Sequence, residues 1–174
     1  NINKSIGETI VEFKEIIDLA KRDQIRTKIY ISVAFECPYE GLVSSKYIYH
    51  LTKEFLTYGI NEVVIADTIG AGKPNQVTKL FRSLVKDFGS SNFSAHFHDT
   101  RLLALSNVKA AMDEGITKFD SCIAGLGGCP FAPGASGNLA TEDLVSMLHK
   151  EGYETGISEE MLRNSAKLAS QLTS

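Results

Sequence analysis

The residues best suited to chemistry in this sequence are His96 and His98, in the segment FSAHFH. Residues i and i+2 of a β-strand point to the same face, so both imidazoles would project together from the end of a strand. Such a pair can bind a divalent metal ion, or it can be a structural pair or part of a solvated edge. Asp99 follows directly and could orient a histidine ring or cap the next helix, and we expect the cap.

A carboxylate ends a second apolar segment, because EVVIAD, residues 62–67, finishes on Asp67. An ionised carboxylate in an apolar setting is costly unless it is hydrogen-bonded, paired or close to a metal ion. Asp67 therefore either belongs to a metal site or accepts backbone N–H bonds from the turn DTIGAG.

The third feature is AGLGGCPFAPGASGN, residues 124–138, which contains five glycines and Cys129 but no charged side chain. Glycines such as Gly127 and Gly128 allow a loop to open and close over a site. A thiol with a pKa near 8.5, moderately shifted, can act as a general acid or base near neutral pH. We therefore expect Cys129 to exchange a proton with a substrate.

Two polar residues follow this loop, and each has two interpretations. Asn138 either caps the next helix or offers its amide oxygen to a hard cation. Glu142 either interacts favourably with the positive end of the helix dipole or supports the site. Cys37 and Cys122 are expected to be an inert turn residue and a small core residue. Three cysteines at irregular spacing argue against a disulfide framework and for a reducing compartment.

Alternating strand and helix signals must position these residues. Ser5 and Glu8 have the spacing of a capping box, and Pro74 opens another helix. The patterns predict strands over 28–34, 62–67, 93–98 and 118–122, and helices over 5–20, 45–58, 74–88, 103–115, 140–150 and 158–172. With no hairpin signals between them, these elements predict βα units and a parallel α/β sheet.

The candidate residues all follow the carboxyl ends of strands, where barrels and open sheets both build their sites. The first βα turn lacks G-x-G-x-x-G, which argues against a dinucleotide-binding sheet and favours a TIM (β/α)8 barrel. A barrel needs eight strands, so about four strands would supply half of one. We expect residues 1–174 to form a single domain, a partial barrel, and the absence of an initial Met suggests a part of something longer.

Composition excludes several classes of function. The 174 residues are 43% hydrophobic and 22% charged, with a net charge of −3, which is an ordinary globular profile. No basic excess indicates nucleic acid, and no apolar run approaches the roughly 18 residues of a membrane span. We therefore expect neither a nucleic-acid nor a membrane partner.

Four motifs together resemble one family. DSCIAGLGGCPFAPGASGNLATEDLV is similar to the active-site signature of the 3-hydroxy-3-methylglutaryl-CoA (HMG-CoA) lyases, and CPYEG, ADTIGAGKP and HFHDT occur in the family's order and spacing. The resemblance covers essentially the whole chain. It implies the carboxyl-terminal half of a (β/α)8 barrel that cleaves HMG-CoA to acetyl-CoA and acetoacetate, as in leucine degradation and ketone body synthesis.

The resemblance also implies roles for individual residues. His96, His98 and Asn138 match metal ligands, for Mg²⁺ or Mn²⁺, and Cys129 matches the cysteine that donates a proton to the acetyl-CoA enolate. Asp67 matches an acidic residue that influences catalysis and metal affinity. Glu142, with Gly127 and Gly128, matches the loop region that contacts the substrate.

The sequence departs from the family in two ways. An early acidic ligand and an arginine that holds substrate have no match here, so we expect the chain alone to be weakly active or inactive. The family usually has Gly after HDT[R/Y], whereas Leu102 follows Arg101 here. Two alternatives remain: an isopropylmalate or citramalate synthase-like enzyme, and a non-catalytic half-barrel. Partners would be an acyl-CoA and either a second copy or an amino-terminal half-barrel, in bacterial cytoplasm or the mitochondrial matrix.

Overall fold

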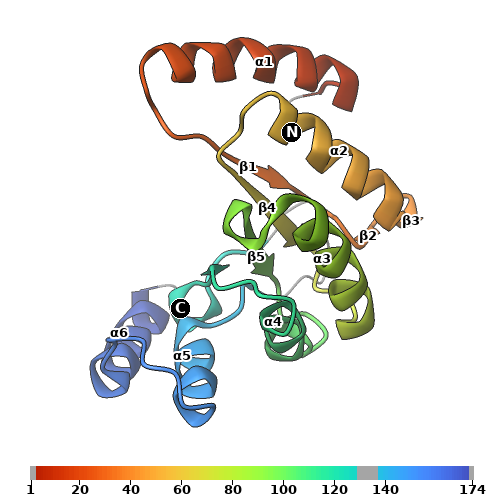
Figure 1. Cartoon of the computed structure of the whole chain (residues 1–174). Helices are drawn as coiled ribbons and strands as arrows, with labels where there is room; N and C mark the ends of the chain where they lie inside the picture. The colour runs from red at the N-terminus through yellow and green to blue at the C-terminus, as the bar shows by residue number, and fades with distance from the viewer. Residues whose placement is uncertain (1–2, 129–136, 173–174) are drawn as a thin grey trace.

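A four-stranded parallel sheet organises the computed structural model, which describes residues 3–128 and 137–172 (Figure 1). The strand order is β1-β4-β5-β6, and all three pairings are parallel. The strands are β1 (Lys28–Ile31), β4 (Glu62–Asp67), β5 (Phe93–Phe97) and β6 (Phe119–Asp120). The predicted βα order and parallel sheet are therefore confirmed.

The six helices that the sequence predicts are present. They are α1 (Ile6–Arg22), α2 (Ser45–Thr57), α3 (Pro74–Phe88), α4 (Ala104–Met112), α5 (Thr141–Lys150) and α6 (Glu159–Leu172), with short 3₁₀ turns η1 (Ser90–Asn92) and η2 (Ile123–Gly125). Ser5 and Glu8 form the predicted capping box at the start of α1. None of the helices described is long and apolar enough to cross a membrane.

The loop after β1 differs from the prediction. The expected strand over 28–34 ends at Ile31, and Val33 has a positive φ of 49°. The chain then forms an antiparallel hairpin of β2 (Glu36–Cys37) and β3 (Gly41–Leu42), so the inference that no hairpin occurs was wrong. Gly41 allows the turn because its φ is 76°, a conformation that glycine adopts without steric cost. The strand predicted over 118–122 is likewise shortened to Phe119–Asp120.

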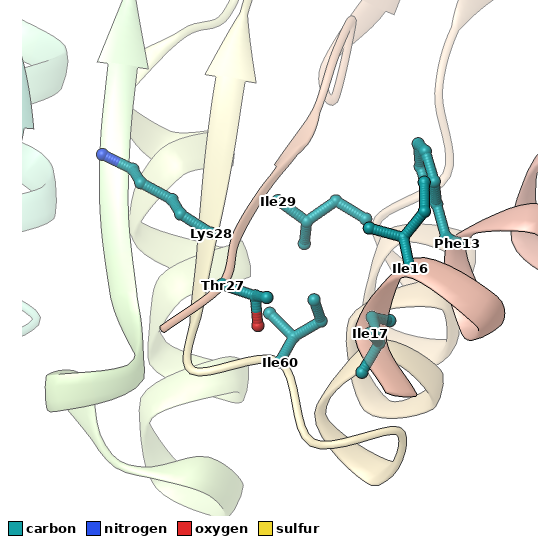
Figure 2. A pocket seen from close by; sticks show the side chains of 7 residues that line it. All are labelled: Phe13, Ile16, Ile17, Thr27, Lys28, Ile29 and Ile60. Atoms are coloured by element: carbon teal, nitrogen blue, oxygen red, sulfur yellow. The ribbon is translucent and has the colours of Figure 1, made fainter. Parts of the chain in front are cut away.

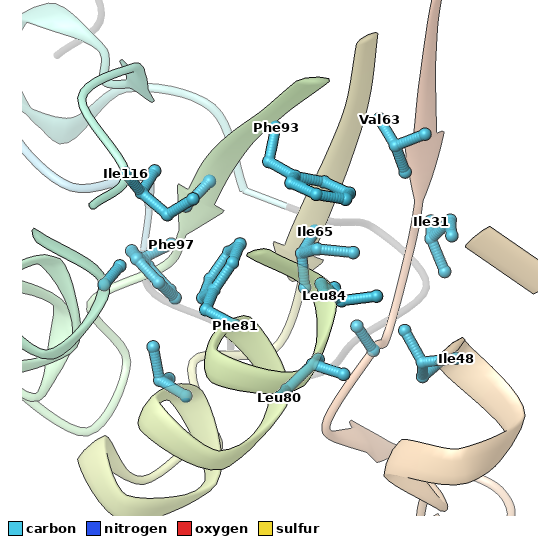
Figure 3. Packing of buried hydrophobic residues seen from close by; sticks show 14 of the residues in the cluster. Ile31, Ile48, Val63, Ile65, Leu80, Phe81, Leu84, Phe93, Phe97 and Ile116 are labelled. Atoms are coloured by element: carbon cyan, nitrogen blue, oxygen red, sulfur yellow. The ribbon is translucent and has the colours of Figure 1, made fainter. Parts of the chain in front are cut away.

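One face of the sheet carries the hydrophobic core. Figure 1 shows α2, α3 and α4 on the same side of the sheet, and Figure 3 shows Phe81, Leu80 and Leu84 of α3 packed against it. Alternate residues of the strands, such as Ile65 and Phe97, point to this face and are fully buried. The core therefore fixes which strand residues must point the other way.

The opposite face of the sheet is polar. Lys28, Glu62 and Asp120 lie on it, and the ammonium group of Lys28 is 3.3 Å from a Glu62 oxygen and 3.2 Å from an Asp120 oxygen. Lys118 contacts the other oxygen of Glu62 at 2.6 Å. Burial alone would raise the pKa of Glu62, but hydrogen bonds from Lys118, Ser94 and Lys28 hold it below its usual range. This face, which a closed barrel would enclose, contains ion pairs rather than a second apolar core.

Candidate metal centre

His96 and His98 lie side by side at the carboxyl end of β5. Their ring centroids are 5.2 Å apart, so the strand register brings both imidazoles to one place, as predicted. The His96 side chain is about one quarter exposed, whereas His98 is buried. The pair therefore has one ring that opens toward solvent beside one ring enclosed by protein.

Asn138 is brought to the same place by backbone pairing. It forms an isolated antiparallel bridge with His98, and the flanking N–H groups of Asp99 and Leu139 donate to the carbonyls of Gly137 and Phe97 at 3.2 and 3.0 Å. Residues 40 positions apart in sequence are thus neighbours in space. The backbone bridge therefore places Asn138 next to His98 at the carboxyl end of β5.

The amide of Asn138 has a fixed orientation. Its Nδ2 donates to the carbonyls of Leu126 at 2.7 Å and Gly127 at 2.9 Å. Its Oδ1 is buried and has no hydrogen-bond partner in the part of the chain that the structure describes. Burying a carbonyl oxygen without a hydrogen-bond donor costs free energy. An oxygen that is placed to bind a cation is expected to lack such a donor. Asn138 does not cap α5, whose N-cap is Ala140, so the capping interpretation is wrong.

These donors fit a divalent cation but do not complete its coordination. Imidazole nitrogens and an amide oxygen suit Mn²⁺, and Mg²⁺ to a lesser degree, because Mg²⁺ prefers oxygen ligands. Across residues 3–128 and 137–172 there is no group of three or more His, Cys, Asp or Glu side chains arranged to hold a metal ion. Among the described residues, His96, His98 and Asn138 would offer a cation two imidazole nitrogens and one amide oxygen, all of them uncharged.

Asp67 ends β4 and is fully buried. Its two carboxylate oxygens accept hydrogen bonds from the N–H groups of Ala71 and Gly72, each at 2.9 Å, so the predicted backbone interaction is present. Burial raises the pKa of Asp67, although these two hydrogen bonds oppose the shift. The Asp67 carbonyl also accepts from the N–H of His98 at 3.2 Å, which ties this turn to the end of β5.

The turn after β5 contains the remaining local predictions. The N-cap residue of α4 is Leu103, but Asp99 accepts a hydrogen bond from the N–H of Ala104, the first residue of α4, at 2.9 Å, so its side chain satisfies a donor at the amino end of the helix. Arg101 lies 3.3 Å from Glu36 of the hairpin. The pair of opposite charges therefore bridges the β1 and β5 loops beside Asp67.

Glu142 secures the amino end of the glycine-rich segment. Its carboxylate accepts a hydrogen bond from the N–H of Ala124 at 3.1 Å, and Ala124 has a positive φ of 53°. Gly127 also has a positive φ, 92°, and a Cβ there would lie 2.8 Å from Nδ2 of Asn138. Gly128 is exposed. Cys129 lies outside the described residues, so its predicted catalytic role remains a prediction.

Asp120 of β6 is a site residue that sequence analysis missed. One of its oxygens lies 3.4 Å from Nδ1 of His96 and accepts a hydrogen bond from the Tyr30 hydroxyl at 2.9 Å. The pKa of Asp120 falls to about 2, chiefly through its interaction with His96, with Tyr30 and Lys28 contributing and burial opposing. The sequence signal that could have indicated Asp120 is a carboxylate inside the predicted strand segment KFDSC, which follows the histidine strand along the chain.

Comparison with known proteins identifies the family of the chain. The model of the HMGL-like family matches residues 1–169 of the chain. The chain belongs to the HMGL-like family. Hydroxymethylglutaryl-CoA lyase from Pseudomonas mevalonii is 39% identical over 99% of this chain, and the Bacillus subtilis enzyme is 42% identical over 96% of it. Human mitochondrial hydroxymethylglutaryl-CoA lyase is 41% identical over 93% of the chain.

Solved structures of HMGL-like proteins share the fold. HMG-CoA lyase from Brucella melitensis superposes with a TM-score of 0.92 at 38% identity, over 99% of this chain and 61% of its own. An HMG-CoA lyase from Acinetobacter baumannii, solved with coenzyme A and 3-methylmalate, gives 0.94 at 35% identity, over 99% of this chain and 56% of its own. The predicted part of a TIM barrel is therefore confirmed.

The chain spans about half the length of the curated relatives it matches. The matched portions are 58% of the Pseudomonas mevalonii protein, 56% of the Bacillus subtilis protein and 50% of the human mitochondrial protein. The family's eight-stranded barrel therefore corresponds here to four parallel strands among the described residues.

Proposed function

We propose that this chain supplies the carboxyl-terminal βα units of a divalent-metal lyase that cleaves HMG-CoA to acetyl-CoA and acetoacetate. Three observations support the proposal: the adjacent rings of His96 and His98, the backbone bridge between His98 and Asn138, and the buried Oδ1 of Asn138, which has no hydrogen-bond partner among the described residues. The names of the relatives support this reaction, and the coenzyme A complex of the Acinetobacter baumannii lyase supports an acyl-CoA substrate.

His96, His98 and Asn138 would hold Mg²⁺ or Mn²⁺. When bound, the ion would supply a Lewis acid for the oxygen atoms of the substrate. The protein contributes a fixed geometry, because the β5 register sets the two imidazoles and two carbonyls hold the amide of Asn138. All three protein ligands are uncharged, which leaves the cation's charge available to a substrate that is itself anionic.

The cleavage requires two proton transfers by the protein. The proton of the tertiary hydroxyl passes to a general base, for which the thiolate form of Cys129 is proposed, and the hydroxyl oxygen becomes the ketone oxygen of acetoacetate. The carbon–carbon bond breaks, and its electron pair moves to the carbon that becomes the methyl group of acetyl-CoA. Cys129 is proposed to protonate that carbon, since a thiol can serve as an acid near neutral pH. Asp67 is proposed to position the end of β5 through its turn, and Glu142 to anchor the glycine-rich loop at Ala124.

The test is an assay of the 174-residue chain with Mg²⁺ or Mn²⁺, alone and mixed with the separately expressed amino-terminal half of a related lyase. We expect little acetoacetate from the chain alone, because the acidic ligand and arginine implied by the resemblance have no match in it. The mixture should form acetoacetate, and Cys129→Ala should abolish this. A folded complex of the two halves that produces none would overturn the proposal.

Two surfaces support a protein partner. Within the described residues, β1 pairs only with β4 and β6 only with β5, so each presents an edge. Beside β1 lies an apolar groove of about 150 Å³, shown in Figure 2 with Phe13, Ile16 and Ile29 among its lining residues. The groove is at the amino ends of the strands, away from the histidines. We propose that an amino-terminal half-barrel or a second copy of the chain covers these edges. Light scattering on the purified chain tests the second possibility, because a monomer in solution would show that two copies do not pair.

Two observations support a proposal about the compartment. Cys37 and Cys122 are free. Named relatives include cytoplasmic and mitochondrial lyases. We propose a reducing compartment, either bacterial cytoplasm or mitochondrial matrix, and fractionation of the native cell would test it.

A further inference from the structure

Asp120 stands behind His96 in a geometry that the proposed lyase chemistry does not use. The two residues are register partners across the parallel β5–β6 pair, and Oδ2 of Asp120 lies 3.4 Å from Nδ1 of His96. This is slightly longer than an ordinary N–H···O hydrogen bond. Nδ1 of His96 is buried and has no hydrogen-bond partner in the described structure, and Oδ2 of Asp120 is an acceptor that lies within ion-pair distance of it.

Other side chains fix the Asp120 carboxylate. Its Oδ2 also accepts from the Tyr30 hydroxyl at 2.9 Å, and its Oδ1 lies 3.2 Å from the Lys28 ammonium group. The ring of Tyr30 meets the ring of His96 edge-on, with centroids 6.1 Å apart. The carboxylate therefore cannot turn away from His96 without losing both of its other partners.

The exposure of His96 distinguishes its two nitrogens. The side chain is 24% exposed, yet Nδ1 is buried beside Asp120, so the exposed area lies on other atoms of the side chain. An acceptor at Nδ1 selects the tautomer that carries its proton there. The other nitrogen, Nε2, then keeps its lone pair for a ligand.

We propose that Asp120 is a positioning residue that holds the proton of His96 on Nδ1 and so presents Nε2 to the metal ion. The effect on metal binding rests on the proposed function, whereas the contact between Asp120 and His96 does not depend on it. Partners of this kind orient ligating histidines and raise their basicity, and their loss typically lowers metal affinity about 10- to 100-fold.

The first experiment observes the tautomer in the metal-free chain. Long-range ¹H–¹⁵N NMR of the imidazoles should show His96 protonated at Nδ1, assigned with His96→Gln. Asp120→Ala should shift the population toward Nε2–H, and Asp120→Asn, which keeps the shape but weakens the acceptor, should shift it less. The proposal is overturned if wild-type His96 is protonated at Nε2, or if both folded variants leave its tautomer unchanged.

The second experiment measures Mn²⁺ affinity by electron paramagnetic resonance. Asp120→Ala should bind Mn²⁺ about 10- to 100-fold more weakly than wild type. The matched control is Glu62→Gln, which removes a carboxylate from the same face, paired with Lys118 and Lys28 but not with His96. This control should keep the wild-type tautomer and affinity. A control that changes both as much as Asp120→Ala would refute the assignment to Asp120.

The two experiments separate the two proposals. If the wild-type chain binds no Mn²⁺ while Asp120→Ala still changes the His96 tautomer, the positioning role stands and the metal function fails. If Mn²⁺ binds equally to wild type and Asp120→Ala, the metal function stands and the positioning role fails.

Discussion

Leu102 is expected to destabilise the turn that follows the histidines, and its replacement by glycine tests that expectation. Its φ is 55°, and 83% of its surface is exposed. The turn is fixed, because the Leu102 N–H donates to the Asp99 carbonyl at 3.0 Å. A left-handed conformation places Cβ of a non-glycine residue too close to its own backbone. Glycine, which has no Cβ, adopts this conformation without that steric cost.

The magnitude follows from three opposing effects. Removing Cβ relieves roughly 1.5 kcal/mol of strain. Glycine raises the entropy of the unfolded chain, which costs about 0.7 kcal/mol. The small part of the leucine side chain that is buried stabilises the fold by about 0.3 kcal/mol, and glycine loses this contribution. Leu102→Gly should therefore increase the free energy of unfolding by about 0.5 kcal/mol.

Leu102→Ala is the matched control, because it removes the same side chain but keeps Cβ. It should be about 0.3 kcal/mol less stable than wild type. The two variants thus differ by about 0.8 kcal/mol, or roughly 2–3 °C in Tm for a chain of this size. Thermal unfolding followed by circular dichroism resolves that difference. If the alanine variant melts at or above the glycine variant, Cβ is not strained at this position and the reasoning is wrong.

Three further substitutions test the supports of the site by urea unfolding. Gly70→Ala would place Cβ 2.8 Å from backbone atoms of the chain after β5, whereas a Cβ at Gly41, which also has a positive φ, would have nothing within 4 Å. Gly70→Ala should therefore lower the free energy of unfolding by about 1–3 kcal/mol more than Gly41→Ala does. Equal losses of stability would contradict the close contact. Glu142→Ala should lose about 1 kcal/mol with its bond to Ala124, and Glu142→Gln, which keeps an acceptor, should lose less. Asn138→Asp removes two N–H donors and places an oxygen against two carbonyls, so the free energy of unfolding should fall by about 2 kcal/mol at pH 7. A variant as stable as wild type would show that these two hydrogen bonds do not hold the amide.

The fold was predictable from the sequence where local signals agreed. Apolar strands such as residues 62–67 alternate with amphipathic helices, and that order admits few arrangements besides a parallel sheet. The hairpin over 36–42 escaped prediction because its strands have two residues each, too short to show a period. It depends instead on Gly41, whose positive φ is a conformational requirement rather than a pattern.

The site was predictable only in part, for a similar reason. His96 and His98 share a strand, so their proximity follows from the two-residue period. Asp120 joins them only through the register of β5 against β6, which is set by packing between segments and is not written in either segment alone. The contact between Asn138 and the carbonyls after η2 likewise requires the chain to return to β5, and the resemblance rather than the spacing indicated that residue.

The two ends of the amide of Asn138 link the proposed chemistry to the loop that contains Cys129. Nδ2 joins the carbonyls of Leu126 and Gly127, while Oδ1 of the same rigid plane remains for the cation. Any rotation that improves one interaction must displace the other, because the amide is planar and its oxygen and nitrogen lie on opposite sides. Binding of the proposed metal ion would therefore be coupled, through this one side chain, to the position of the loop's amino end.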